Sequence, residues 1–134
     1  TFGYTFTDAT FLNSFGSDAS LWGEVQSGDE LPYIAKHQFN TSISLEHNRF
    51  ELNLNGRLNG AFKTEASADA VNAANGITSN FIIDFVGKYH VSKSLSLSAK
   101  IINVLDKTYA VAKVPAGLRP GHPFGIYGGL NFRF

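Results

Sequence analysis

The side chains that could bind a metal or act in catalysis are scattered along this chain and form no active-site motif. The histidines are His37, His47, His90 and His122, and none has a second histidine two or four residues away. Cysteine is absent, which excludes thiolate ligands and a disulfide framework. Serines and acids are numerous, but no segment resembles a nucleophile elbow. The sequence therefore predicts no metal site, no cofactor and no enzymatic activity.

Charge and hydropathy exclude two broad classes of protein. The chain has 11 basic and 11 acidic residues, so nothing in its charge favours nucleic acid or an anionic membrane surface. No run approaches the roughly 20 apolar residues of a membrane-spanning helix. A mean hydropathy close to zero is still compatible with a membrane β-barrel, because only alternate residues of each strand meet lipid.

Apolar and polar residues alternate in six segments, and this period of two predicts six strands. The predicted strands cover residues 2–11, 37–46, 49–60, 77–89, 95–101 and 124–134. The connections between them alternate in length, with long ones at 12–36, 61–76 and 105–123 and tight ones at 47–48 and 91–94. A short alanine-rich stretch, 66–74, is predicted to be helix-like. Short turns on one rim and long loops on the other are typical of outer-membrane barrels.

The last predicted strand has the clearest membrane pattern. Its apolar residues share one face, and its glycine and polar residues share the other. An alternating strand of about ten residues is long enough to cross an outer membrane at a tilt. The aromatic residue at its end suggests that the barrel-assembly machinery recognises this strand. The predicted barrel-insertion signal consists of Tyr127, Leu130, Phe132 and Phe134.

Aromatic residues sit at the two ends of the predicted apolar face, and aliphatic residues lie between them. Such girdles are expected where a barrel crosses the two membrane interfaces. The ring-bearing residues are Phe39, Phe81 and Phe124 near the long connections and Phe50, Tyr89, Phe132 and Phe134 near the tight turns.

The opposite face carries charged residues such as Glu51, Arg57, Asp84 and Lys88. In a small packed barrel these charges would lose their hydration, whereas a wide barrel offers a wet lumen or a polar plug. Alternation alone also allows a soluble β-sandwich whose polar face meets solvent.

Six strands cannot close a wide barrel, and open edges do not persist in hydrocarbon. We therefore predict an all-β fold, a transmembrane antiparallel β-barrel of which this chain supplies the last six strands. The other strands would come from a missing amino-terminal part or from another chain. The chain begins at Thr1, inside a strand pattern and without a signal peptide, so we expect a carboxy-terminal piece of a longer exported protein.

Four segments resemble the TonB-dependent outer-membrane receptors. Residues 102–109 contain Asn-Val-Leu-Asp-Lys-x-Tyr, 117–123 contain Arg-Pro-Gly-x-Pro, and 127–134 close the chain, as at the carboxy-terminus of these receptors. Residues 31–40 resemble a loop-to-strand transition of the ferric-citrate type. One departure is Phe124, where the family often has arginine. The resemblance covers essentially all of residues 1–134 and implies the end of a barrel of about 22 strands, without its plug.

The resemblance also implies a function for the complete protein. It would be an outer-membrane active transporter that takes up a ferric chelate, a siderophore or ferric citrate, with energy from TonB. Implied partners are the rest of the barrel and its plug, TonB through the missing amino-terminal part, the barrel-assembly machinery, lipid and lipopolysaccharide. A periplasmic carboxy-terminus would place the three long connections outside the cell. The alternative is a porin-like or structural barrel segment assembled with other chains.

Ligand contacts are expected on the long connections, although the sequence does not identify the ligand. Arg119-Pro120-Gly121 could bind the carboxylates of a chelate, but receptors for very different ligands share this motif. That favours a role in shaping the return of the chain into the last strand. The candidate ligand contacts are Trp22, Tyr33, Lys107, Tyr109, Lys113 and Arg119.

Overall fold

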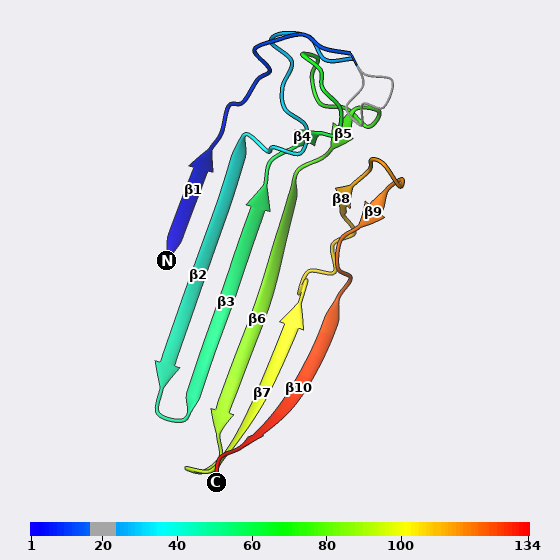
Figure 1. Cartoon of the computed structure of the whole chain (residues 1–134). Coiled ribbons are helices and arrows are strands. Elements are labelled where there is room, and N and C mark those ends of the chain that lie inside the picture. The colour runs from blue at the N-terminus through cyan, green and yellow to red at the C-terminus, as the bar shows by residue number, and fades with distance from the viewer. Residues whose placement is uncertain (17–23) are drawn as a thin grey trace.

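The computed structural model describes residues 1–16 and 24–134 and is built from strands. Its main sheet has six antiparallel strands, each paired with the next one of the sheet along the chain (Figure 1). Two short hairpins, β4–β5 and β8–β9, lie within the connections. The main strands are β1 (Phe2–Phe6), β2 (His37–His47), β3 (Phe50–Asn59), β6 (Asn80–His90), β7 (Leu95–Ile102) and β10 (Gly125–Phe132). The hairpin strands are β4 (Phe62–Lys63), β5 (Gly76–Ile77), β8 (Ala110–Ala112) and β9 (Arg119–Pro120).

The long connections gather at one end of the sheet, and the tight turns lie at the other end with the carboxy-terminus (Figure 1). The tight turns are residues 48–49 and 91–94, and the long connections are 7–36, 60–79 and 103–124. This arrangement confirms the predicted alternation of long and short connections. Among the described residues, no helix is long and apolar enough to cross a membrane.

Strand register divides the sheet into one apolar and one polar face. Ile43 lies opposite Leu54, and Leu54 lies opposite Phe85 on the next strand. The adjacent rung of the ladder is polar and joins Ser42, Asn55 and Asp84. On β7 and β10 the apolar pairs continue, for example between Leu97 and Leu130. The sequence predicted these faces correctly, because a period of two leaves each residue only one of two sides.

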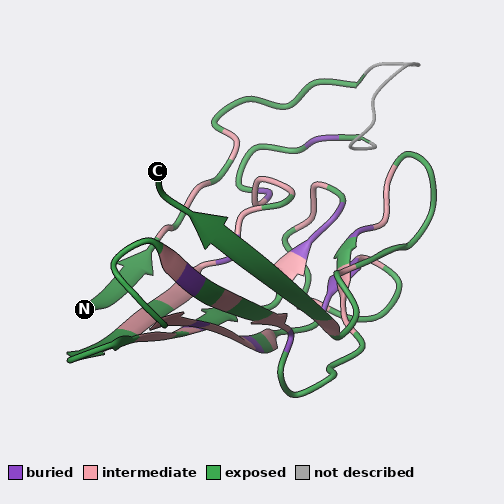
Figure 2. Ribbon diagram, turned by 90° about the horizontal axis from the view of Figure 1, so that it is seen from below, coloured by how far each residue is buried: buried purple, intermediate pink, exposed green. Residues whose placement is uncertain are grey.

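No second layer covers the apolar face in the described part of the chain. Ile43 is 64% exposed and Leu130 is 72% exposed, far beyond what a soluble core would leave open. Figure 2 shows that most of each strand is coloured exposed or intermediate, and that buried residues form short stretches. The β-sandwich alternative therefore does not describe this chain. The buried hydrophobic residues in the described part are Val25, Ala35, Ile77, Ile82 and Ala112, and four of these five lie outside the main sheet.

Side-chain hydrogen bonds join the polar face across the strands. The Asn53 amide Nδ2 donates to Ser42 Oγ at 3.1 Å and to Ser44 Oγ at 2.6 Å. The Asn55 amide in turn donates to Asn53 Oδ1. Such cross-strand pairs stabilise a sheet whose polar face is exposed to water.

The first strand is shorter than predicted. It was expected to reach Phe11, but β1 ends at Phe6, and the last backbone bond to the segment before β2 is the Thr7 N–H, which donates to Lys36 O at 2.9 Å. Asp8 then forms an ion pair with Lys36, with Nζ and Oδ1 3.2 Å apart, and the chain leaves the sheet. Beyond this point the chain pairs with residues 28–31 of the first long connection instead of β2, and the alternation does not contain these contacts.

Three other predicted boundaries were wrong by a few residues. The strand expected from Ile77 begins at Asn80, because Ile77 is buried in a hairpin opposite Phe62. The tight turn expected at 47–48 lies at 48–49. The last strand is Gly125–Phe132 rather than 124–134.

The prediction of a helix-like segment over 66–74 is wrong. Asn72 Oδ1 accepts hydrogen bonds from the backbone N–H groups of Ala74, at 2.8 Å, and Asn75, at 3.2 Å. The Asn72 N–H donates to Asn75 Oδ1 at 2.7 Å. These side-chain bonds offer the backbone an alternative to helical hydrogen bonding, and asparagine favours them.

Asn48 has a φ of 50°, in the left-handed region that asparagine and glycine tolerate and β-branched residues do not. Asn48→Val should therefore lower the free energy of unfolding by about 1–2 kcal/mol. Asn48→Gly is the control and should unfold at nearly the same urea concentration as the unmodified protein. The measurement is a urea titration of the complete barrel in lipid vesicles, and equal stability of both variants would contradict the turn geometry.

Candidate functional site

The three long connections meet at one end of the sheet and form a loop cluster, defined here as residues 24–36, 60–79 and 103–124. The first connection reaches the second through the Glu30 N–H, which donates to Ser67 O at 3.2 Å, and the Tyr33 N–H, which donates to Lys63 O at 2.7 Å. It reaches the third through the Tyr33 hydroxyl, which donates to Val114 O at 3.0 Å. Backbone and side chain of Tyr33 thus join all three connections.

Tyr33 occupies a constrained position. Its φ is 63°, and its ring centroid lies 6.0 Å from that of Phe62. Its hydroxyl oxygen also accepts a hydrogen bond from the Val114 N–H at 2.9 Å. The hydroxyl therefore both donates to and accepts from the backbone of Val114. The residue as a whole remains 39% exposed, so part of its surface is open to a ligand.

The loop cluster contains a buried lysine. Lys63 is 2% exposed, and its Nζ lies 3.2 Å from Glu30 Oε2 and 2.7 Å from Ser67 O. Glu30 also holds Lys36, with Oε1 and Nζ 3.0 Å apart. A buried ammonium group needs such a countercharge, because its hydration is lost. The sequence analysis missed this pair, since the two residues belong to different connections and no local motif links them.

Opposing effects act on the pKa of Glu30. Burial by itself would raise it, but hydrogen bonds and the positive charges of Lys36 and Lys63 outweigh burial. The pKa of Glu30 is therefore lowered, and the carboxylate is stabilised in its charged form.

Asn103, the first residue of the Asn-Val-Leu-Asp-Lys-x-Tyr motif, is fully buried and has a φ of 51°. Its N–H donates to Asp84 Oδ1 at 2.9 Å. Its amide Nδ2 donates to the carbonyls of Lys107, at 2.9 Å, and His122, at 3.0 Å, and its Oδ1 accepts the Lys107 N–H at 3.0 Å. Asn103 thus ties both ends of the third connection to β6. The sequence analysis quoted the motif but did not single out this residue.

Tyr109 packs closely against Gly121. The Gly121 N–H donates to Tyr109 O at 2.7 Å, and a Cβ at position 121 would lie 2.0 Å from the Tyr109 ring. Only glycine fits there, so the Pro-Gly part of the motif shapes the return toward β10. The role of Tyr109 as a ligand contact stays a prediction.

The remaining predicted ligand contacts differ in whether their charged side chains already have hydrogen-bond partners. The Lys113 ammonium donates to the carbonyls of Ala73, at 3.1 Å, and Ala74, and so joins the third connection to the second. Lys107 and Arg119 are exposed, and within the described part of the chain their side chains make no hydrogen bond or ion pair. These two cations are available to an anionic ligand. Trp22 lies outside the described residues.

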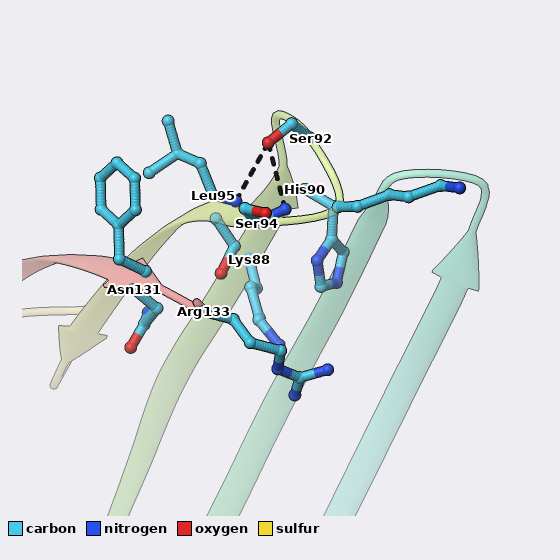
Figure 3. A pocket seen from close by; sticks show the side chains of 10 residues that line it. Lys88, His90, Ser92, Ser94, Leu95, Asn131 and Arg133 are labelled. Carbon is cyan, nitrogen blue, oxygen red and sulfur yellow. Dashed lines mark hydrogen bonds between the residues drawn. The ribbon is translucent and has the colours of Figure 1, made fainter.

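A second feature lies on the polar face at the turn end of the sheet (Figure 3). It is a hollow of about 350 Å³ whose lining includes Lys88, His90, Ser96, Asn131 and Arg133. None of the predicted ligand contacts that lie in the described residues lines it. Among the described residues, no group of three or more histidines and acids is placed to hold a metal ion.

Comparison with known proteins gave matches among solved structures only. No protein-family model and no curated protein matches the chain. The ferric-catecholate import receptor Fiu of Escherichia coli K12, in its closed form, matches 99% of this chain with a TM-score of 0.76 and 24% identity. The ferripyoverdine receptor of the Pseudomonas aeruginosa outer membrane matches 77% with a TM-score of 0.59 and 17% identity. A variant of the ferric enterobactin receptor PfeA of the same species matches 80% with a TM-score of 0.57 and 21% identity.

The chain has the fold of part of an outer-membrane receptor barrel. It spans 18% of the Fiu chain, 15% of the ferripyoverdine receptor and 17% of PfeA. The predicted all-β barrel segment is therefore confirmed, and so is the resemblance to this class of receptor at the level of the fold. All three matched proteins are receptors rather than enzymes.

The Glu30 ion pairs should stabilise the folded conformation of the loop cluster. In Glu30→Gln the buried Lys63 loses its countercharge, and local stability should fall by about 2–3 kcal/mol. The measurement is hydrogen exchange of residues 62–77 in the complete receptor. Asp8→Asn is the control, since it removes only an exposed partner of Lys36 and should cost below about 1 kcal/mol. Equal exchange in both variants would contradict this role of Glu30.

The same ion pairs predict a pH dependence. Because the pKa of Glu30 is lowered on folding, its contribution is complete above the ordinary value of 4.5 and is lost as the pH falls through the lowered pKa. Below pH 4.5, exchange of residues 62–77, corrected for intrinsic rates, should accelerate in the unmodified protein. Glu30→Gln should lack this acid step, and an identical acid step in that variant would assign it to another group.

Proposed function

We propose that this chain is part of an outer-membrane receptor that takes up a ferric chelate, such as a ferric siderophore or ferric citrate, with energy supplied through TonB. The observation that carries the proposal is the match of nearly the whole chain to a ferric-catecholate import receptor. The loop cluster adds independent support, because it presents exposed cations at one end of a sheet with one apolar and one polar face.

In this receptor the sheet forms part of the barrel wall. The apolar face contacts lipid and lipopolysaccharide, and the polar face lines the lumen that the plug occupies. The free edges of β1 and β10 pair with the rest of the same barrel, because unpaired backbone groups are too costly in hydrocarbon. TonB contacts a part of the receptor outside this chain.

The loop cluster is the proposed chelate-binding end. Lys107 and Arg119 bind the negative charge of the chelate, because guanidinium and ammonium groups are suited to carboxylate and catecholate oxygens. Tyr33, Tyr109 and Trp22 remain proposed contacts. Lys113 contributes indirectly, since its ammonium group holds two connections together.

Insertion of the barrel is a separate proposal. Leu130 and Phe132 lie on the apolar face, and Leu130 is paired with Leu97. Tyr127 lies on the polar face opposite Lys100, so the four residues of the proposed insertion signal do not share one side. The barrel-assembly machinery would therefore have to contact both faces of β10 and Phe134.

An uptake experiment tests the function. Cells that express the complete receptor and lack their other receptors of this class should accumulate radiolabelled iron supplied as ferric enterobactin, ferripyoverdine or ferric citrate. Removal of TonB should abolish this uptake. Iron uptake that is the same with and without TonB would instead support the porin-like alternative, in which solutes diffuse through the barrel.

The two free cations should contribute to chelate affinity. The double variant Lys107→Ala and Arg119→Ala should bind the transported chelate about three- to tenfold more weakly, because each exposed charge pair contributes below about 1 kcal/mol. Arg49→Ala removes an exposed cation at the opposite end of the sheet and is the matched control. Binding is measured by fluorescence titration of the purified receptor, and an unchanged Kd would remove these residues from the site.

Surface labelling tests the orientation, in which the carboxy-terminus is periplasmic. A cysteine at Asp69, in the second long connection, should react on whole cells with a maleimide that cannot cross the outer membrane. A cysteine at Asn48, in a tight turn, should react only after the cells are opened. Labelling of the second position alone on whole cells would reverse the proposed orientation.

A further inference from the structure

The hollow at the turn end of the polar face brings together basic side chains from β6 and from the end of the chain. Lys88 and His90 lie on β6, opposite Ser98 and Ser96 of β7. Arg133 follows β10, and its N–H donates to Ser94 O at 2.9 Å, which holds it next to the β6–β7 turn. In Figure 3 the side chains of Lys88, His90 and Arg133 extend over the same side of the sheet. These three residues are called the basic hollow below.

No aspartate or glutamate is among the described residues that line the hollow. Glu51 supplies one carboxylate, and two of the three residues share it: His90 Nε2 lies 2.5 Å and Lys88 Nζ lies 3.6 Å from Glu51 Oε1. Arg133 is exposed and has no ionic partner among the residues that the structure describes. The Glu51 carboxylate, which lies opposite Glu46 of β2, is therefore shared by Lys88 and His90, and Arg133 keeps no ionic partner within the described part of the chain.

The hollow is also shaped to receive a group. Its volume is about 350 Å³, and Ser96 and Asn131 add polar groups to its wall. The turn beside it is held in place, because Ser92 Oγ accepts hydrogen bonds from the N–H groups of Ser94, at 3.2 Å, and Leu95, at 3.1 Å (Figure 3). A fixed concave surface loses less entropy on binding than a mobile one.

We propose that an acidic polypeptide segment in the barrel lumen docks on the basic hollow and places an Asp or Glu carboxylate between Arg133 and Lys88. This inference rests on the proposed function, in which the polar face lines a lumen filled by the rest of the same receptor. A segment that covered Arg133 without supplying a carboxylate would remove the hydration of its guanidinium group and leave the charge unpaired. This is strongly unfavourable. Arginine also binds a carboxylate through two parallel hydrogen bonds, which fixes its orientation.

A polypeptide segment fits this surface better than a lipid phosphate does. The basic hollow lies on the polar face, whereas lipid would contact the apolar face on the other side of the sheet. The matched receptors also have far more chain than this segment, which spans only 15–18% of their length. Most of the polypeptide that could occupy a lumen therefore lies beyond residues 1–134.

Zero-length carbodiimide cross-linking tests the docking, because it joins an amine to a carboxylate only when the two are in contact. Arg133→Lys keeps the charge and introduces a reactive amine. In the complete receptor, mass spectrometry should find this amine joined to an Asp or Glu outside residues 1–134 of the same chain. The Lys88–Glu51 pair, 3.6 Å apart, should cross-link in the same sample and is the internal positive control. A sample with the Lys88–Glu51 product but no such link, or with a link to a different protein, overturns the proposal.

A neutral substitution provides a second measurement. Arg133→Gln should accelerate hydrogen exchange in the cross-linked luminal segment by about tenfold, the effect of losing one charge-assisted hydrogen bond. Arg57→Gln is the matched control: it neutralises another exposed arginine on the polar face, nearer the loop end, and should leave that segment unchanged. Equal effects of the two variants would overturn the specific role of Arg133. A receptor that imports iron but fails both tests refutes this inference alone.

Discussion

The uninterrupted antiparallel register of the six strands is the constraint on which the rest of the structure depends. Every backbone group that crosses hydrocarbon must be hydrogen-bonded, and pairing between neighbouring strands is how a sheet achieves this. A slip of one residue would move every side chain of a strand to the other face. Ile43, Leu54 and Phe85 would then exchange places with Ser42, Asn55 and Asp84. In the proposed barrel the cost of exposing a charge to lipid makes the register specific, and the register then defines the lipid-facing and lumen-facing sides together.

The loop cluster is a small folded unit built on this sheet. Its buried residues, such as Ile77 and Ala112, come from different connections, and Lys63 and Glu30 form an ion pair between two of them. Asn103 links it to the wall through Asp84, a residue of the polar face at the loop end of β6. Backbone groups that leave the sheet are thereby satisfied by side chains, which allows long connections to hold defined positions. This positions the exposed Lys107 and Arg119 on a supported surface.

Electrostatics differ between the two ends of the sheet. At the loop end, charges that join the connections are paired and partly buried, and among the described residues Lys107 and Arg119 remain unpaired. At the turn end, one carboxylate serves Lys88 and His90, and Arg133 adds a further positive charge. An open sheet can hold such unpaired charges because water reaches them. In the proposed barrel a ligand would pair the cations at one end and the lumen contents would pair Arg133 at the other, which relates the two proposals physically.

The sequence by itself determined the strands of the main sheet, their faces, the tight turns to within a residue and the end of the sheet at which the loops gather, but not the hairpins β4–β5 and β8–β9. It did so because a period of two is local and each residue has only two sides to occupy. Only the tertiary structure decided where β1 ends and which charges meet, whereas 66–74 is not helical because Asn72 and Asn75 form local hydrogen bonds. Asp8 with Lys36, Glu30 with Lys63 and Asn103 with Asp84 are contacts between residues of different segments. The basic hollow likewise requires β6, β7 and the residue after β10 to be adjacent. Such groupings depend on how the chain returns on itself, which no local alternation contains.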